Sequence, residues 1–436
     1  MGNEKSIYNT GNYIKFFVLS FIGIFTFFIP ITINDNRTIP LDHIVTFLKE
    51  TFGPAIPYYI LIVIIMGAVY PFWKKTWNKN VVEIILSIFK VIGAIVTVML
   101  VFNFAPAWMA DPDMAPYLFD KLVMSVGLIV PVGAVFLALL VGYGLLEFVG
   151  VFLQPVMRPI WKTPGRSAID AVASFVGSYG IGLLITNRVF KKGMYTVREA
   201  TIIATGFSTV SVTFMIIIAK TLDMMDIWNI YFWVTLVVTF LVTAITVRIW
   251  PLSKLSDDYY EGQEGHPEQI VKEDKLKVAW GQAMEVADKA PSLPKNIWIN
   301  FKDGFEMTMA ILPSIMSIGL LGLVLSEYTP LFDIIGYIFY PFTWLMQVPE
   351  PLLAAKASAI EIAEMFLPSL LVVDAPLITK FVTAVVSVSA ILFFSALIPC
   401  ILATEIPVSI PKLIVIWIER TILTIIIVTP IAYLLL

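Results

Sequence analysis

Long apolar runs constrain this chain more than any other feature of its sequence. Three of the clearest extend from Val81 to Phe102, from Phe232 to Val247 and from Leu413 to Leu436. A helix that crosses a bilayer needs roughly 18 such residues, and these runs approach or exceed that length. Hydrophobic residues make up 58% of the chain and charged residues only 14%, whereas soluble domains average about 25% charged residues. We therefore expect an integral membrane protein.

The apolar stretches predict an all-α polytopic membrane protein with about nine transmembrane helices. The predicted spans are residues 16–33, 56–73, 81–102, 122–143, 199–220, 229–250, 306–326, 377–399 and 411–433. No small-residue cleavage site follows the first span, so we expect it to be retained and not removed as a signal peptide. Two further stretches, 167–187 and 352–373, are long enough to span but carry Ser, Gly, Pro or Glu near their middles.

Basic residues predict which side of the membrane each loop faces, because Lys and Arg accumulate on the cytoplasmic side. Lys74 and Lys75 follow the second span, whereas the segment 103–120 after the third has no Lys or Arg. The N-terminus is then cytoplasmic. The stretch 167–187 has basic residues on both flanks, which favours a re-entrant helical hairpin that enters from the cytoplasm and returns to it.

An internal repeat predicts a second hairpin of the opposite orientation. A constant shift of the sequence places Leu145, Glu147, Gly150 and Pro155 on Leu331, Asp333, Gly336 and Pro341. An odd number of predicted spans separates these two segments, so the second half is upside down and its hairpin, 352–373, enters from outside. Inverted repeats with discontinuous helices are typical of secondary transporters. The alternative is a duplication that serves stable packing alone.

The repeat divides the chain into four parts. We expect N-terminal scaffold helices at 1–120, a first repeat at 121–250 with the inner hairpin, a cytoplasmic loop at 251–300, and a second, inverted repeat at 301–436 with the outer hairpin. Within the loop, residues 275–289 have the apolar spacing of a helix that lies on the membrane or on the bundle.

Two glutamates in the second interrupted stretch are the main candidates for a site. Glu361 and Glu364 are three residues apart and would share one face of a helix. A carboxylate near the bilayer centre is unfavourable by roughly 2.5 to 3.5 kcal/mol on insertion scales, so this pair indicates a hydrated cavity, a bound solute or a cation. The alternatives are a solvated pair at the hairpin mouth, or neutralisation by Lys356.

A run of hydroxyl residues from Thr205 to Thr213, beside Gly206, lies inside one predicted span. These hydroxyls could bond back to their own helix, or they could mark an unwound segment that coordinates Na⁺ or a solute. The region 387–399 of the second half is a weaker version of this pattern. Glu419 and Arg420, in the last span, are expected to form ion pairs within the bundle.

Other chemistries find little support in the sequence. The single cysteine, Cys400, excludes an intramolecular disulfide, and two histidines make a zinc or iron cluster implausible. No nucleophile, base or metal constellation is visible, so we expect neither an enzyme nor a resident cofactor, with Na⁺ as the one candidate ion. We also expect no nucleic acid polymer as a partner.

The order of elements and the phrase TGFSTVSVTF resemble the Gate, or nucleoside recognition, superfamily, and more narrowly the bacterial YjiH-type membrane proteins. A wider similarity is to concentrative nucleoside transporters, through the GFSTVS motif at 206–211 and through Lys356 followed by Glu361. The resemblance covers about residues 120–436 and implies a multi-pass protein of a bacterial-type inner (plasma) membrane. It also implies an inner hairpin, a partly unwound helix and an outer hairpin.

The resemblance also implies roles for particular residues. The substrate-binding candidates are Glu361, Glu364, Ser178, Tyr179 and Phe207, and the cation-binding candidates are Gly177, Ser178, Thr205 and Thr209. Glu361 would contact a pair of sugar-like hydroxyls. The first hairpin reads SFVGSYGIG where nucleoside transporters have Gln, Thr and Glu for the base.

Two functions from different classes follow. The first is a cation-coupled (Na⁺ or H⁺) secondary transporter, or symporter, of a small polar solute, with nucleoside-like compounds as the first candidates and a homo-oligomeric assembly in the bilayer. The alternative is a Gate-domain subunit of a larger membrane complex that does not transport by itself.

Overall fold

The structure, a computed structural model of the chain, describes residues 7–29, 31–33, 36–38, 40–78, 81–112, 114–176, 179–268, 273–402 and 404–436. Most of this part is helical. Its strands, β1 (Ile31–Ile33) and β2 (Asn36–Thr38), pair antiparallel with Ile31 opposite Thr38. The prediction of an all-α polytopic membrane protein is confirmed.

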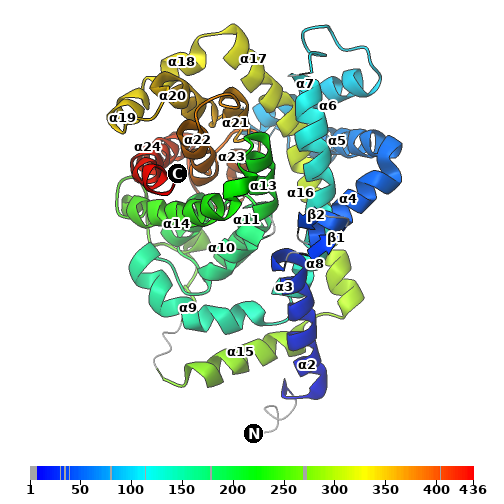
Figure 1. Cartoon of the computed structure of the whole chain (residues 1–436). Coiled ribbons are helices and arrows are strands. Elements are labelled where there is room, and N and C mark those ends of the chain that lie inside the picture. The colour runs from blue at the N-terminus through cyan, green and yellow to red at the C-terminus, as the bar shows by residue number, and fades with distance from the viewer. Residues whose placement is uncertain are drawn as a thin grey trace.

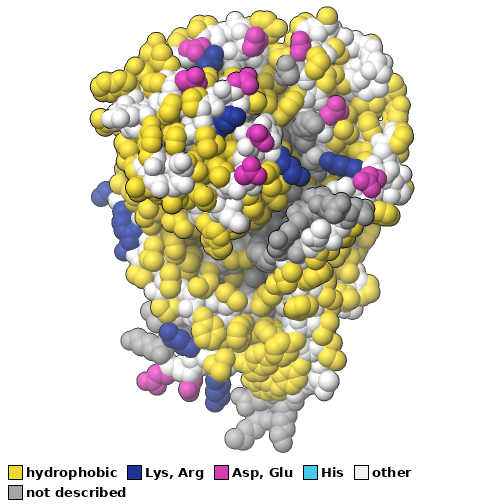
Figure 2. Space-filling view, viewed as in Figure 1, with side chains coloured by type: hydrophobic (Ala, Val, Ile, Leu, Met, Phe, Trp, Pro, Cys, Tyr) yellow, Lys and Arg dark blue, Asp and Glu magenta, His cyan; other side chains and the backbone are white. Residues whose placement is uncertain are grey.

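Six helices in the described ranges are long and apolar enough to cross a bilayer: His43–Trp73, Glu83–Val101, Ala115–Phe136, Met225–Thr246, Leu293–Tyr328 and Ile410–Leu435. Hydrophobic side chains cover most of the face shown in Figure 2, and charged side chains lie on it in small groups. Such a surface suits lipid and not water. The other predicted spans are shorter or interrupted helices.

The N-terminal part forms a group of helices on one side of the molecule (Figure 1). Its elements are α2 (Thr10–Ile14), the π-helical turn η1 (Lys15–Leu19), α3 (Ser20–Phe28), α4 (Pro40–Phe52), the 3₁₀ turn η2 (Gly53–Ala55), α5 (Ile56–Trp73) and α6 (Val81–Val101). After these come α7 (Ala115–Tyr117), the π-helical turn η3 (Leu118–Val123) and α8 (Met124–Val141).

One long helix from the second half packs into this group. It consists of α16 (Leu293–Ser314), η7 (Ile315–Gly319) and α17 (Leu320–Tyr328), and α16 contacts α8, α5 and α6. Two glycines permit the close approach: a Cβ added at Gly67 would lie 1.9 Å from the carbonyl oxygen of Met309, and one at Gly93 would lie 2.0 Å from that of Pro313. Small residues allow such backbone contact between helices in membranes.

The remainder of the first half is a series of short and broken helices. They are α9 (Leu145–Trp161), α10 (Ser167–Val176), α11 (Tyr179–Lys191), α12 (Val197–Gly206), α13 (Val212–Thr221), the 3₁₀ turn η4 (Met225–Ile227) and α14 (Trp228–Thr246). Helices α10 and α11 pack against each other as a hairpin. Thr196 begins α12 with a capping box, in which its hydroxyl accepts from Glu199 N–H at 3.2 Å and Glu199 Oε2 accepts from Thr196 N–H at 2.9 Å.

The second half repeats this order of elements. Its helices are α18 (Leu331–Gly336), α19 (Tyr340–Leu345), α20 (Pro351–Ile360), α21 (Leu367–Leu371), α22 (Leu377–Ser389), α23 (Leu397–Leu402) and α24 (Ile410–Leu435). Helices α20 and α21 form a second pair, α22 and α23 are two pieces of one predicted span, and α24 packs against α22 and α14. Helix α9 lies at the lower end in Figure 1, and α18 lies at the upper end.

The polar segment between the halves lies against the first hairpin. It contains the 3₁₀ turns η5 (Leu252–Lys254) and η6 (Tyr260–Gly262), followed by α15 (Lys275–Lys289), the helix that the apolar spacing predicted, which packs on α9 and α2. The Glu268 carboxylate accepts from the N–H groups of Gly165 at 2.8 Å and Arg166 at 2.9 Å. These N–H groups lie just before α10, where a helix attracts negative charge.

Candidate functional site

Two helices are broken near the centre of the described core, one in each half. Helix α12 ends at Gly206 and α13 begins at Val212, where the Ser211 hydroxyl accepts from Phe214 N–H at 3.3 Å. Helix α22 ends at Ser389 and α23 begins at Leu397. We call residues 207–211 the first break and residues 390–396 the second break.

A hydrogen-bonded turn follows each helix end, although the central residue of the second turn, Ile391, has a left-handed backbone (φ 69°) and that of the first does not. Thr209 N–H donates to the carbonyl of Phe207 at 2.8 Å, and Leu392 N–H donates to the carbonyl of Ala390 at 2.8 Å. A helix that stops leaves its last carbonyls without partners along the chain. In a bilayer those carbonyls need partners from neighbouring helices.

Side chains from α14 and α24 bond to the carbonyls at the two helix ends. Thr243 Oγ1 donates to Gly206 O at 2.9 Å, and Arg420 Nε donates to Ser389 O at 2.8 Å. Arg420 Nη1 also donates to Thr243 Oγ1 at 2.9 Å. One buried guanidinium thus links the two helix ends, and its positive charge complements the negative end of a helix dipole.

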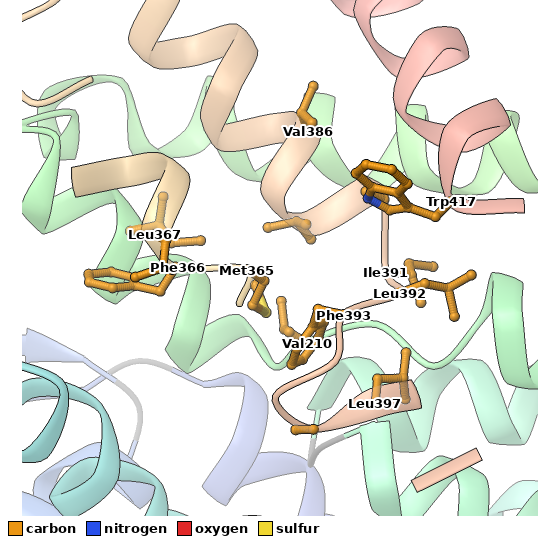
Figure 3. Packing of buried hydrophobic residues seen from close by; sticks show 14 of the residues in the cluster. Val210, Met365, Phe366, Leu367, Val386, Ile391, Leu392, Phe393, Leu397 and Trp417 are labelled. Atoms are coloured by element: carbon orange, nitrogen blue, oxygen red, sulfur yellow. The ribbon is translucent and has the colours of Figure 1, made fainter. Parts of the chain in front are cut away.

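The tip of the second hairpin is fastened to the second break. Phe394 N–H donates to Ile362 O at 2.7 Å, and Ser395 N–H donates to Ala363 O at 2.9 Å. These bonds satisfy backbone groups that are not in a helix. Figure 3 shows Phe393 of this break beside Val210 of the first break, with Met365 of the hairpin close by.

Glu361 lies at this tip and is fully buried. Its Oε2 accepts from the indole N–H of Trp417, whereas its Oε1 has no hydrogen bond within the described residues. Arg420 is one turn beyond Trp417 on α24, and the described residues show no ion pair between it and Glu361. Glu361 therefore has one free oxygen in the interior of the protein.

Glu361 and Glu364 are neither solvated at the hairpin mouth nor neutralised by Lys356. Glu361 and Glu364 have exposures of 0% and 2%, so they are not solvated surface residues. Lys356 does not neutralise them, because its Nζ pairs with Asp333 Oδ2 at 3.1 Å. The guanidinium of Arg420 bonds to Ser389 and Thr243, and the adjacent positions 419 and 420 of one helix do not face each other.

Glu364 borders a pocket between the two halves. Its Oε2 accepts from Phe366 N–H at 2.6 Å. The pocket is lined by Ser125, Val126, Ile129, Val130, Tyr179, Val210, Ser211, Phe214, Ile217, Ile315, Glu364, Met365 and Phe393. Both breaks, the second hairpin, α11, α8 and η7 all contribute to this wall.

The other site residues named from the sequence lie at varied distances from this pocket. Tyr179 lines it together with Glu364, whereas Glu361 does not. Phe207 packs edge-on against Trp161 and obliquely against Phe240, with ring centroids 6.0 and 5.8 Å away. Gly177 and Ser178 lie outside the described residues.

The two threonines named as cation ligands differ from each other. Thr205 Oγ1 donates to Thr201 O at 2.8 Å, which is the back-bonded arrangement left open above. Thr209 Oγ1 is buried without a hydrogen bond in the described part of the chain. No group of three or more His, Cys, Asp or Glu residues able to hold a metal ion occurs among the residues that the structure describes.

Sequence reasoning missed Asp170 on α10. This carboxylate is buried and accepts from Thr186 Oγ1 at 2.6 Å and from the Tyr195 hydroxyl at 2.8 Å. It holds the two arms of the first hairpin and the start of α12 together. A carboxylate inside an apolar stretch was the available signal.

The comparisons with known proteins place this architecture in a family. A family model described as nucleoside recognition, named Gate, matches residues 123–225. The chain is also 32% identical to an uncharacterized protein of Alkalihalophilus pseudofirmus over 441 aligned residues, which cover 95% of this chain and 93% of that protein.

The chain belongs to the Gate family. The prediction of the Gate superfamily is thus confirmed, whereas the narrower resemblance to YjiH-type proteins stays a prediction. The family supports a transporter-like membrane role. No solved structure matches the chain. The Gate match contains α10, α11, α12 and α13, the first hairpin and the first broken helix.

Proposed function

We propose that this Gate protein is a secondary transporter that moves a small polar solute between its two halves, coupled to Na⁺ or H⁺. The observation that carries the proposal is the buried carboxylate of Glu361 at a hairpin tip beside two helix breaks, one of whose oxygens has no hydrogen bond among the described residues. Buried intramembrane charges are costly and usually functional. Discontinuous helices at a repeat interface are where transporters bind solutes and coupling ions.

The proposal includes an inverted repeat. Its support is the shared order of elements in the two halves, together with α9 and α18 at opposite ends of the molecule (Figure 1). The basic flanks of the first hairpin place it at the cytoplasmic side. We assign the chain to a bacterial-type inner membrane with a cytoplasmic N-terminus.

Within this proposal, Glu361 accepts from solute hydroxyl or amine groups, and Glu364 and Tyr179 border the solute. Thr209, whose hydroxyl is free, is the better placed of the two threonines for a cation. The roles proposed for Gly177, Ser178, Thr205 and Phe207 rest on the family resemblance alone. Nucleoside-like compounds are the first solutes to test.

A ligand screen by thermal shift, with and without Na⁺, tests the proposal. A ligand that binds only the folded chain raises the melting temperature by mass action. Glu361→Gln keeps the shape but removes the charge, and charge-assisted bonds contribute about 1.5 to 3 kcal/mol each. The affinity of Glu361→Gln for the ligand should fall about tenfold or more. The control Asp333→Asn, on the exposed arm, should bind the ligand as the parent does. If Glu361→Gln binds the ligand found in the screen as tightly as the parent does, Glu361 is not part of the binding site.

A further inference from the structure

The pocket between the halves contains the carboxylate of Glu364, which forms no ion pair in the described part of the chain. Four charged side chains are buried among the described residues, namely Asp170, Glu361, Glu364 and Arg420. Asp170 has two hydroxyl donors, and Glu361 has the Trp417 indole and the nearby charge of Arg420. Within the described residues Glu364 has only backbone donors, and no Lys or Arg there forms an ion pair with it.

The pocket walls around Glu364 are apolar and aromatic. Tyr179, Phe214 and Phe393 line it, and Tyr179 meets Phe393 edge-on with centroids 5.8 Å apart. The faces of aromatic rings attract cations, most strongly where water is excluded. A carboxylate beside several rings is a combination that recognises an organic ammonium ion.

The oxygens in the pocket suit a metal ion less well. Ser125 Oγ already accepts from the Lys49 ammonium at 2.9 Å, and Ser211 Oγ caps α13. Hard cations require several oxygen ligands together. An ammonium group needs only the carboxylate for its charge, and its carbon body can contact the rings.

We propose that this pocket binds a small organic ammonium ion with an apolar body, its nitrogen at Glu364 and its body against Tyr179, Phe214 and Phe393. Organic ammonium ions would then be the solutes of the transporter proposed above. Only their movement across the membrane rests on that proposed function. Binding alone can be measured without transport.

The test compares isopentylamine, which is ionised at pH 7, with isopentyl alcohol, its uncharged isostere, and with uridine. Thermal shift and calorimetry on the purified full-length chain measure each dissociation constant. The amine should bind about tenfold or more tightly than the alcohol, the worth of one charge-assisted bond. Equal affinities, or binding of uridine with none of the amine, would overturn the assignment.

Variants locate the binding. Glu364→Gln should lower amine affinity about tenfold and leave alcohol affinity unchanged. Glu419→Gln, which removes a half-buried carboxylate of α24 away from the pocket, should bind both as the parent does. If Glu364→Gln fails to fold, Phe393→Leu replaces it: loss of the ring should weaken the amine about threefold and spare the alcohol. Parent-like amine affinity in the folded variant overturns the assignment.

The two proposals fail in different ways. Amine binding that depends on Glu364, without uptake into liposomes, leaves the pocket assignment standing and refutes transport. Uptake of an uncharged solute, with no amine binding, leaves transport standing and refutes the ammonium assignment.

Discussion

Replacing Arg420 with methionine should destabilise the protein more than almost any other single change. The guanidinium is fully buried, and it bonds Ser389 O at 2.8 Å and Thr243 Oγ1 at 2.9 Å. Hydrogen bonds to charged groups contribute about 1.5 to 3 kcal/mol each, so two of them contribute roughly 3 to 6 kcal/mol.

The assay is equilibrium unfolding of the purified chain in mixed micelles. Arg420→Met should lower the free energy of unfolding by roughly 3 to 6 kcal/mol, the contribution of these two bonds. Arg420→Lys keeps the charge but cannot make both bonds in the same geometry, so its loss should be smaller.

A double-mutant cycle separates charge pairing from packing. In Arg420→Met the buried carboxylate of Glu361 loses its nearby cation, which destabilises the folded protein. Glu361→Gln replaces that carboxylate with an uncharged amide and so removes this loss of stability. The double variant should therefore be more stable than the sum of the single losses predicts, with a coupling of about 0.5 to 3 kcal/mol. Parent-like stability of Arg420→Met, or a strictly additive cycle, would refute the role assigned to Arg420.

Three further predictions follow from the arrangement of the helices. Cysteines at the exposed positions Lys162 and Lys192, in a chain without Cys400, should both react with a membrane-impermeant reagent from the cytoplasmic side; labelling from opposite sides would make 167–187 a plain span. Gly67→Ala should shift α16 and cost about 1 to 3 kcal/mol, measured by thermal unfolding; an unchanged melting temperature would show that the contact gives way easily. The chain should form a homo-oligomer in mild detergent, because a fixed scaffold leaves the hairpins free to move; a monomer by light scattering and by cross-linking in membranes would count against this.

Local signals in the sequence predicted much of the architecture. The length of the apolar runs predicted the long helices, because the thickness of a bilayer sets how many residues a spanning helix needs. Basic flanks indicated the first hairpin, which is the pair α10 and α11. Hydroxyls beside Gly206 favoured a helix break, and α12 does end at that glycine.

The partners of the buried charges could not be predicted in the same way. Arg420 reaches Thr243, which is 177 positions away in the chain, and nothing local to either residue indicates the contact. The neighbouring Glu419 drew attention to a pairing that helix geometry disfavours. Glu364 and Tyr179 were named as site residues, but their shared pocket depends on Val210 and Phe393, whose apolar character carries no signal of a site.

Gradient-driven uptake tests the central claim most directly. The purified chain alone is sealed into liposomes, and a ligand that stabilises it is supplied outside with an imposed Na⁺ or pH gradient. The account predicts accumulation above the external concentration with one of the two gradients, and only leak in Glu361→Gln liposomes. A ligand that binds tightly yet never enters parent liposomes under either gradient would contradict the account and favour a subunit that needs a partner.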